Sequence, residues 1–212
     1  MNRLVIISIF LFLLSVFACK KEGVDPYSIR GKVADARNAS GLSGVTIKVE
    51  KQAVQNGVYS STYVRALTTT TGGDGYYEGT WERETITSLK VIAEKDRYIP
   101  VNVVLTEQEI GSGDITKNIT MHPEAFASLQ FVHNGANSND YLSYNFTNTN
   151  FDCACCKPGW KDVLGDTTVT CKVYGDHWLV YKIQTHINDV DSSYTDSIWC
   201  PAFSVTSTII NY

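Results

Sequence analysis

Short runs of alternating apolar and polar residues constrain this chain more than any other feature of its sequence. One such run has apolar residues at Val45, Ile47 and Val49 with single polar residues between them. A period of two places alternate side chains on opposite faces of an extended strand. Similar runs, separated by turns rich in Gly, Asn, Ser and Asp, recur along the chain with almost no helical periodicity. The sequence therefore predicts an all-β protein.

The composition agrees with a folded chain and excludes one class of partner. Of 212 residues, 43% are hydrophobic and 19% are charged, a balance that distinguishes the chain from disordered proteins. The formal net charge is −4, and the sequence contains no long run of Lys or Arg that could neutralise a phosphate backbone. We therefore expect no nucleic-acid partner.

The N-terminal segment predicts export. One basic residue, Arg3, precedes the uncharged and mostly apolar residues 4–18, and Cys19 follows. This apolar run is shorter than the roughly 20 residues that cross a bilayer. A basic start, a short apolar middle and a small residue before the cleavage site describe a secretory signal. We expect residues 1–18 to be a signal peptide.

The end of this segment, Val16-Phe17-Ala18-Cys19, resembles the lipobox of bacterial lipoproteins. The resemblance implies that Cys19 carries a diacylglycerol and an acyl chain such as palmitate, and that residues 19–27 tether the protein to a membrane. Lys20 occupies the position at which an aspartate would favour inner-membrane retention, so the resemblance implies an outer-membrane lipoprotein, periplasmic or surface-exposed. The alternative is an ordinary signal peptide with an incidental cysteine.

Residues 28–122 contain seven short alternating runs, which predict a β-sandwich. Three of its motifs, IRGKV at 29–33, GLSGVTIKV at 41–49 and TTTGGDGYY at 69–77, are similar to those of the carboxypeptidase regulatory-like domain. The resemblance implies a transthyretin-like sandwich without peptidase residues, so it implies no catalytic site.

Residues 123–212 predict a second, Ig-like β-sandwich that begins at Pro123. A long alternating strand ends at Ile187, and we expect a polar turn over residues 188–193 before a return strand over 194–199. Because Trp178 alternates with Leu179, it is expected on the opposite face from the apolar residues of this strand.

Five cysteines follow Cys19. An exported protein meets oxidising conditions, so we expect disulfides that brace the second sandwich, with one thiol left over. We expect two disulfides that join the 153–156 loop to the flanking strands and involve Cys171 and Cys200, which alternation places at inward positions. Their pairing stays open among the candidates Cys153, Cys155, Cys156, Cys171 and Cys200.

A metal or thiol site is the alternative interpretation of the same cluster. Three crowded thiols, Cys153, Cys155 and Cys156, could bind zinc or copper with His177 or His186. However, their spacing differs from that of paired C-x-x-C zinc modules, and alternation places the two histidines on opposite faces of one strand. We expect no metal and no cofactor.

The sequence contains no G-x-S-x-G elbow, no H-E-x-x-H motif and no glycine-rich phosphate loop. We therefore expect a lipid-anchored structural or interaction module of the cell envelope that is not an enzyme. Its expected partners are the membrane, through the lipid anchor, and an unidentified envelope protein or glycan. The alternative is a surface lipoprotein that captures carbohydrate or peptide nutrients. Its candidate contacts are Trp160, Trp178 and Trp199, because tryptophan offers a broad apolar ring to a ligand.

Overall fold

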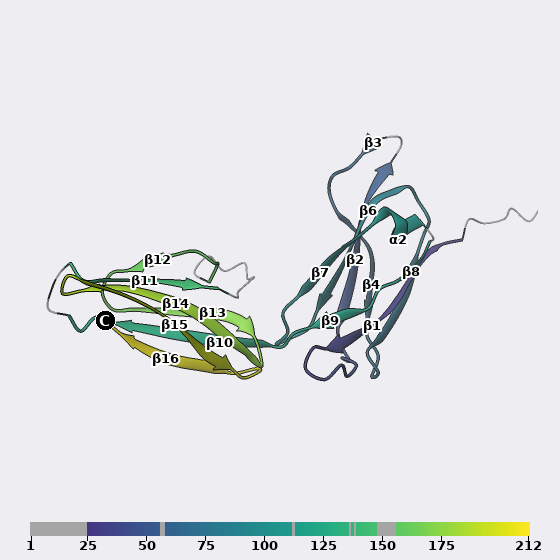
Figure 1. Cartoon of the computed structure of the whole chain (residues 1–212). Helices are drawn as coiled ribbons and strands as arrows, with labels where there is room; N and C mark the ends of the chain where they lie inside the picture. Colours follow the sequence, from purple (N-terminus) through teal and green to yellow (C-terminus); the bar gives the residue numbers. More distant parts are fainter. Residues whose placement is uncertain (1–24, 56–57, 112, 136, 138, 148–155) are drawn as a thin grey trace, which may run out of the picture.

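The computed structural model describes residues 25–55, 58–111, 113–135, 137, 139–147 and 156–212. These residues form two β-sandwiches joined end to end in an elongated, bent molecule (Figure 1). Each sandwich has its own hydrophobic core. The prediction of an all-β fold is confirmed. Within the described residues no helix is long and apolar enough to cross a bilayer.

Two sheets form the first sandwich. One sheet contains β5 (Tyr76–Trp81), β1 (Tyr27–Asp35), β8 (Asp114–Thr116) and β9 (Ile119–Met121). The other contains β3 (Val58–Tyr59), β4 (Val64–Thr70), β2 (Thr46–Gln55), β6 (Ile86–Glu94) and β7 (Val101–Leu105). A short helix that the sequence did not predict, α2 (Glu107–Gly111), links β7 to β8.

The alternation in β1 explains how the first core is built. Ile29 and Val33 are buried between the sheets, while Arg30 is exposed. Gly31 lies between these apolar residues, and a Cβ at this position would collide with the carbonyl oxygen of Lys117. The glycine therefore allows the chain after β8 to approach β1 closely, before β9 pairs with the end of that strand.

The second sandwich has a narrow sheet and a wide sheet. The narrow sheet has the strand order β13 (Thr167–Tyr174), β10 (Glu124–Val132), β16 (Val205–Asn211). The wide sheet has the order β12 (Lys161–Val163), β11 (Tyr141–Phe146), β14 (His177–Ile187), β15 (Val190–Cys200). The core between them contains the stacked rings of Phe131 and Tyr144, whose centroids are 5.1 Å apart.

The hairpin of β14 and β15 is longer than the sequence suggested. Only Asn188 and Asp189 form its turn, with positive φ angles of 51° and 63°. Such angles at both central residues characterise the tight turn that matches strand twist. The expected turn over residues 188–193 is therefore wrong, because residues from Val190 onward already pair with β14.

Phe203, in the connection between β15 and β16, joins the two sandwiches. Its ring packs against the first core, with its centroid 5.5 Å from that of Tyr98. The guanidinium carbons of Arg37 and Arg97 lie 5.1 and 4.5 Å from the same ring centroid. Arg97 also donates a hydrogen bond of 2.7 Å to the Phe203 carbonyl oxygen. These contacts hold the second sandwich in a defined orientation on the first.

Asp35 positions Arg37 at this junction. Its side chain is buried and accepts hydrogen bonds from Arg37 Nη2 at 2.7 Å and from the Tyr98 hydroxyl at 2.8 Å. The hydrogen bonds from Arg37 are the main cause that lowers the pKa of Asp35 from 3.8 to about 2. The ionised carboxylate is therefore more stable in the folded protein than in the unfolded chain.

We predict that Asp35→Asn lowers the free energy of unfolding at pH 7 by about 2 kcal/mol, since one pKa unit corresponds to about 1.4 kcal/mol. The folded-state pKa is depressed, so the contribution is present above pH 4 and is lost as the pH falls towards 2. Urea unfolding across this pH range measures the difference between wild type and variant. Asp189→Asn, at a fully exposed side chain, is the control. A difference that does not shrink in acid would contradict the prediction.

Candidate functional site

The candidate site is the side of the wide sheet that faces away from the core. On β14 the side chains of Leu179, Tyr181 and Ile183 are buried, so the residues between them point outward. We call this surface of the hairpin the outer face. It comprises Trp178, Val180, Lys182, Gln184 and His186 on β14 and Asp191, Ser193, Thr195, Ser197 and Trp199 on β15.

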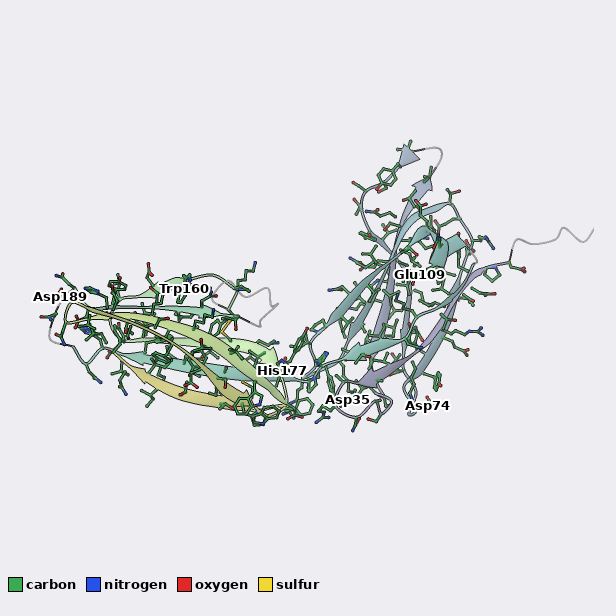
Figure 2. All side chains as sticks on the ribbon, in the orientation of Figure 1. Asp35, Asp74, Glu109, Trp160, His177 and Asp189 are labelled. Atoms are coloured by element: carbon green, nitrogen blue, oxygen red, sulfur yellow. A yellow bond between two sulfur atoms is a disulfide. The ribbon has the colours of Figure 1, made fainter. Side chains whose placement is uncertain are left out.

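Two of the three candidate tryptophans meet at one end of the outer face. Trp178 and Trp199 are direct cross-strand partners, and their ring centroids are 5.5 Å apart at an interplanar angle of 60°. Trp178 remains 53% exposed and Trp199 39% exposed. The prediction from alternation that Trp178 points away from the core is confirmed. The pair forms an exposed aromatic platform near the junction, where Figure 2 labels the neighbouring residue His177.

Trp160 lies apart from this pair. It is 45% exposed and immediately precedes β12, which β11 separates from β14 in the wide sheet. The structure therefore brings together two of the three predicted contacts and leaves the third at the opposite edge of the sheet.

An aromatic and polar cluster that the sequence did not indicate occupies the other end of the outer face. The ring of Tyr141 on β11 stacks on His186, with centroids 5.3 Å apart. His186 Nδ1 lies 2.7 Å from a carboxylate oxygen of Asp191, and this hydrogen bond is the main cause that raises the pKa of His186. Tyr141 and Asp191 line an open pocket of about 410 Å³ together with Gln184, Thr185, Ser192 and Ser193.

This second cluster depends on the register of the hairpin. His186 is paired with Asp191, and only the pair Ile187 and Val190 lies between them and the turn. Asp140, a buried carboxylate, accepts a hydrogen bond of 3.0 Å from the backbone nitrogen of Asn188 and so supports that turn. The sequence signal for the cluster would have been the Asn-Asp dipeptide, read as a two-residue turn.

The cysteines give one disulfide among the described residues. Cys156 and Cys171 are bonded, with their Cα atoms 5.6 Å apart, and the bond ties the segment before β12 to β13. Cys153 and Cys155 lie outside the described residues. Cys200 has a free, buried thiol, so the expectation that it forms a disulfide is wrong. Its inward position on β15 was read correctly, but there the thiol packs in the core as a small apolar group.

The metal interpretation gains no support from the described part of the chain. No group of three or more His, Cys, Asp or Glu side chains gathers there in a way that could hold a metal ion. His177 and His186 lie at opposite ends of β14, so they do not belong to one site. The absence of a metal stays a prediction, because two cysteines of the cluster are not described.

In comparisons with known proteins, this chain is similar only to solved structures. No family model and no curated protein matches the sequence. Catechol 1,2-dioxygenase from Pseudomonas arvilla C-1 is 13% identical, with 48% of this chain and 54% of that chain covered and a TM-score of 0.34. The shaft pilin SpaA from Lactobacillus rhamnosus GG is 8% identical, with 88% and 98% covered and a TM-score of 0.34. This chain thus spans about half the length of the dioxygenase.

The dioxygenase structures contradict the expectation that the chain is not an enzyme, and that expectation is corrected. One fold can support many unrelated functions, so the lack of a catalytic motif is not sufficient to assign a non-enzymatic role. At these identities and TM-scores the likeness assigns no reaction to this chain either. Membership of the carboxypeptidase regulatory-like family stays a prediction.

We predict that alkylation with iodoacetamide leaves Cys200 unmodified in the native protein and modifies it in urea. The reactive species is the thiolate, and burial both shields this thiol and raises its pKa. Peptide mapping by mass spectrometry measures the modification, and Cys156 and Cys171 should react only after reduction. Rapid native modification of Cys200, or its recovery in a disulfide-linked peptide, would contradict the structure.

Proposed function

We propose that this chain is a lipid-anchored interaction module of the cell envelope. In this proposal Cys19 holds the N-terminus on a membrane, the first sandwich is a spacer, and the second sandwich presents the outer face to a partner. The observation that carries the proposal is the end-to-end arrangement. Strand β1 begins at the end of the first sandwich that is remote from the junction, and the C-terminus lies at the far end of the second sandwich (Figure 1).

The tether supports the role of the first sandwich as a spacer. The eight residue steps from Cys19 to Tyr27 can extend over at most about 28 Å, which is short enough to keep the first sandwich beside the membrane. The contacts of Phe203 with Tyr98 and Arg97 then direct the second sandwich away from the start of β1. A binding face on the second sandwich would thus be held clear of lipid headgroups.

The exposure of Trp178 and Trp199 favours a second candidate function, the capture of carbohydrate or peptide at the surface. The two functions are compatible, because a capture protein also needs an anchor and a spacer. On the basis of the lipobox resemblance, Lys20 favours an outer membrane as the location of the anchor. The protein would then be periplasmic or surface-exposed. The partner of the module, in either case, would contact the outer face.

We predict that cells expressing the full chain incorporate labelled palmitate into it and that Cys19→Ala abolishes the label. Two or three acyl chains anchor a protein stably on a membrane, so the wild type should stay in the membrane fraction after a high-salt wash. The variant should lose stable, lipid-dependent membrane attachment. Cys200→Ala, which removes a core thiol, is the matched control and should keep the label. An unlabelled wild type would refute lipid anchoring.

A further inference from the structure

We propose that the outer face binds a linear, uncharged polysaccharide that lies along β14 and β15. This inference rests on the proposed function and names the class of ligand that the module would bind. It depends on four features of the outer face: its aromatic ends, its polar middle, its length and its charge.

The two ends of the outer face both offer aromatic rings. Trp178 and Trp199 supply the platform near the junction, and Tyr141 supplies a ring that is 41% exposed at the other end. A sugar ring presents apolar C–H groups on its faces, and these groups pack favourably against an exposed aromatic ring. In Figure 2, His177, the first residue of β14, and Asp189, in the turn after that strand, mark the near and far limits of this surface.

The middle of the outer face is polar and lacks bulky side chains on β15. Ser193, Thr195 and Ser197 point outward at alternate positions and are exposed, so their hydroxyl groups are spaced by about 7 Å along the strand. Lys182 and Gln184 on β14 lie beside them. Such hydroxyl, amide and ammonium groups can exchange hydrogen bonds with the hydroxyls of several successive sugars.

The length of the outer face indicates an extended ligand. Eight residue steps separate Trp178 from His186 on β14, and at about 3.4 Å per step this distance is roughly 27 Å. A disaccharide is too short to contact both aromatic ends, whereas a hexasaccharide can do so. Binding should therefore become tighter with ligand length until both ends are occupied.

The charge of the outer face favours an uncharged ligand over an acidic one. Its outward residues on β14 and β15 include one permanent cation, Lys182, and one carboxylate, Asp191. Tight binding of carboxylate or phosphate groups generally uses Arg or clustered cations, and these two strands provide neither at outward positions. An acidic polysaccharide would also approach the carboxylates of Asp191 and Asp189 at the far end.

A peptide fits the outer face less well than a polysaccharide. Extended peptides commonly bind a sheet by adding a strand to its edge, with backbone hydrogen bonds. The rings of Trp178, Trp199 and Tyr141 instead rise from the flat face of the sheet. Binding of a peptide but of no glycan would overturn the proposal.

Isothermal titration calorimetry on the full chain, purified in detergent, tests the ligand class. The probes are cellohexaose, xylohexaose and maltohexaose as uncharged chains, an oligogalacturonate as an acidic chain, and an extended polyvaline-threonine peptide. We predict that at least one uncharged hexasaccharide binds, and binds at least tenfold more tightly than both its disaccharide and the oligogalacturonate. Failure of all three uncharged chains to bind, or equal affinity for the acidic chain, would overturn the proposal.

Variants then locate the binding surface. Trp178→Ala should weaken binding of the preferred hexasaccharide at least tenfold, and Trp178→Tyr should restore most of the affinity. Tyr141→Ala should weaken binding of the hexasaccharide more than that of the trisaccharide, because only the longer ligand reaches that end. Tyr76→Ala, at an exposed tyrosine of the first sandwich, is the matched control and should have no effect.

Two further measurements separate the possible causes of failure. The first is thermal unfolding of each variant, which reports any loss of the folded structure. The second is binding to Thr195→Lys, which blocks the middle of the outer face at an exposed position without removing an aromatic contact. If Thr195→Lys binds as tightly as wild type, the location is wrong. Lipid anchoring is measured independently through Cys19, so a labelled chain that binds no glycan would refute only the ligand class.

Discussion

The packing of Phe203 against the first sandwich is the contact on which the arrangement of the molecule depends. Phe203 belongs to the second sandwich by sequence, yet its ring contacts Tyr98 and two arginines of the first. Asp35 holds one of these arginines, Arg37, in place through an ion pair in which the carboxylate is buried and the arginine is partly exposed. Domains linked only by a flexible segment would be free to reorient, whereas this junction also has backbone hydrogen bonds from Glu124 to Arg97 and from Phe203 to Glu124. The direction of the outer face relative to the start of β1 is thereby defined.

Local pattern predicted the strands well, because alternation depends only on neighbouring residues. It identified the buried row of Val45, Ile47 and Val49 and the outward position of Trp178. The junction could not be predicted in this way, since 106 positions separate Arg97 from Phe203 in the chain. Whether Cys200 forms a disulfide could not be predicted either, because an inward position on a strand suits a disulfide and a packed thiol equally well.

The candidate site was only half predictable, and the reason is the turn between β14 and β15. Polar residues such as Asp191 and Ser193 resemble turn residues in composition. The local sign that they continue a strand is the preceding Asn188-Asp189 dipeptide, which can complete a turn in two residues. Positive φ angles at Asn188 and Asp189 complete the turn in two residues, which adds these polar residues to the hairpin. His186 is then paired with Asp191. The polar end of the outer face is thus a consequence of backbone geometry at two positions.

The unequal widths of the two sheets in the second sandwich explain why its hairpin is exposed on both sides. Three strands oppose four, so β15 extends past the cover of the narrow sheet, and its inward residues Tyr194 and Asp196 are exposed. Asp196 accepts a hydrogen bond of 3.2 Å from Tyr181 on the core side. Carboxylates along an edge strand oppose pairing with another sheet, so the edge of β15 is protected while its outer face stays accessible.

The cross-strand contact of Trp178 and Trp199 stabilises the hairpin, but this contact leaves 53% of Trp178 exposed. In the proposal of glycan binding, this exposed part of the ring is the surface that would pack against a sugar.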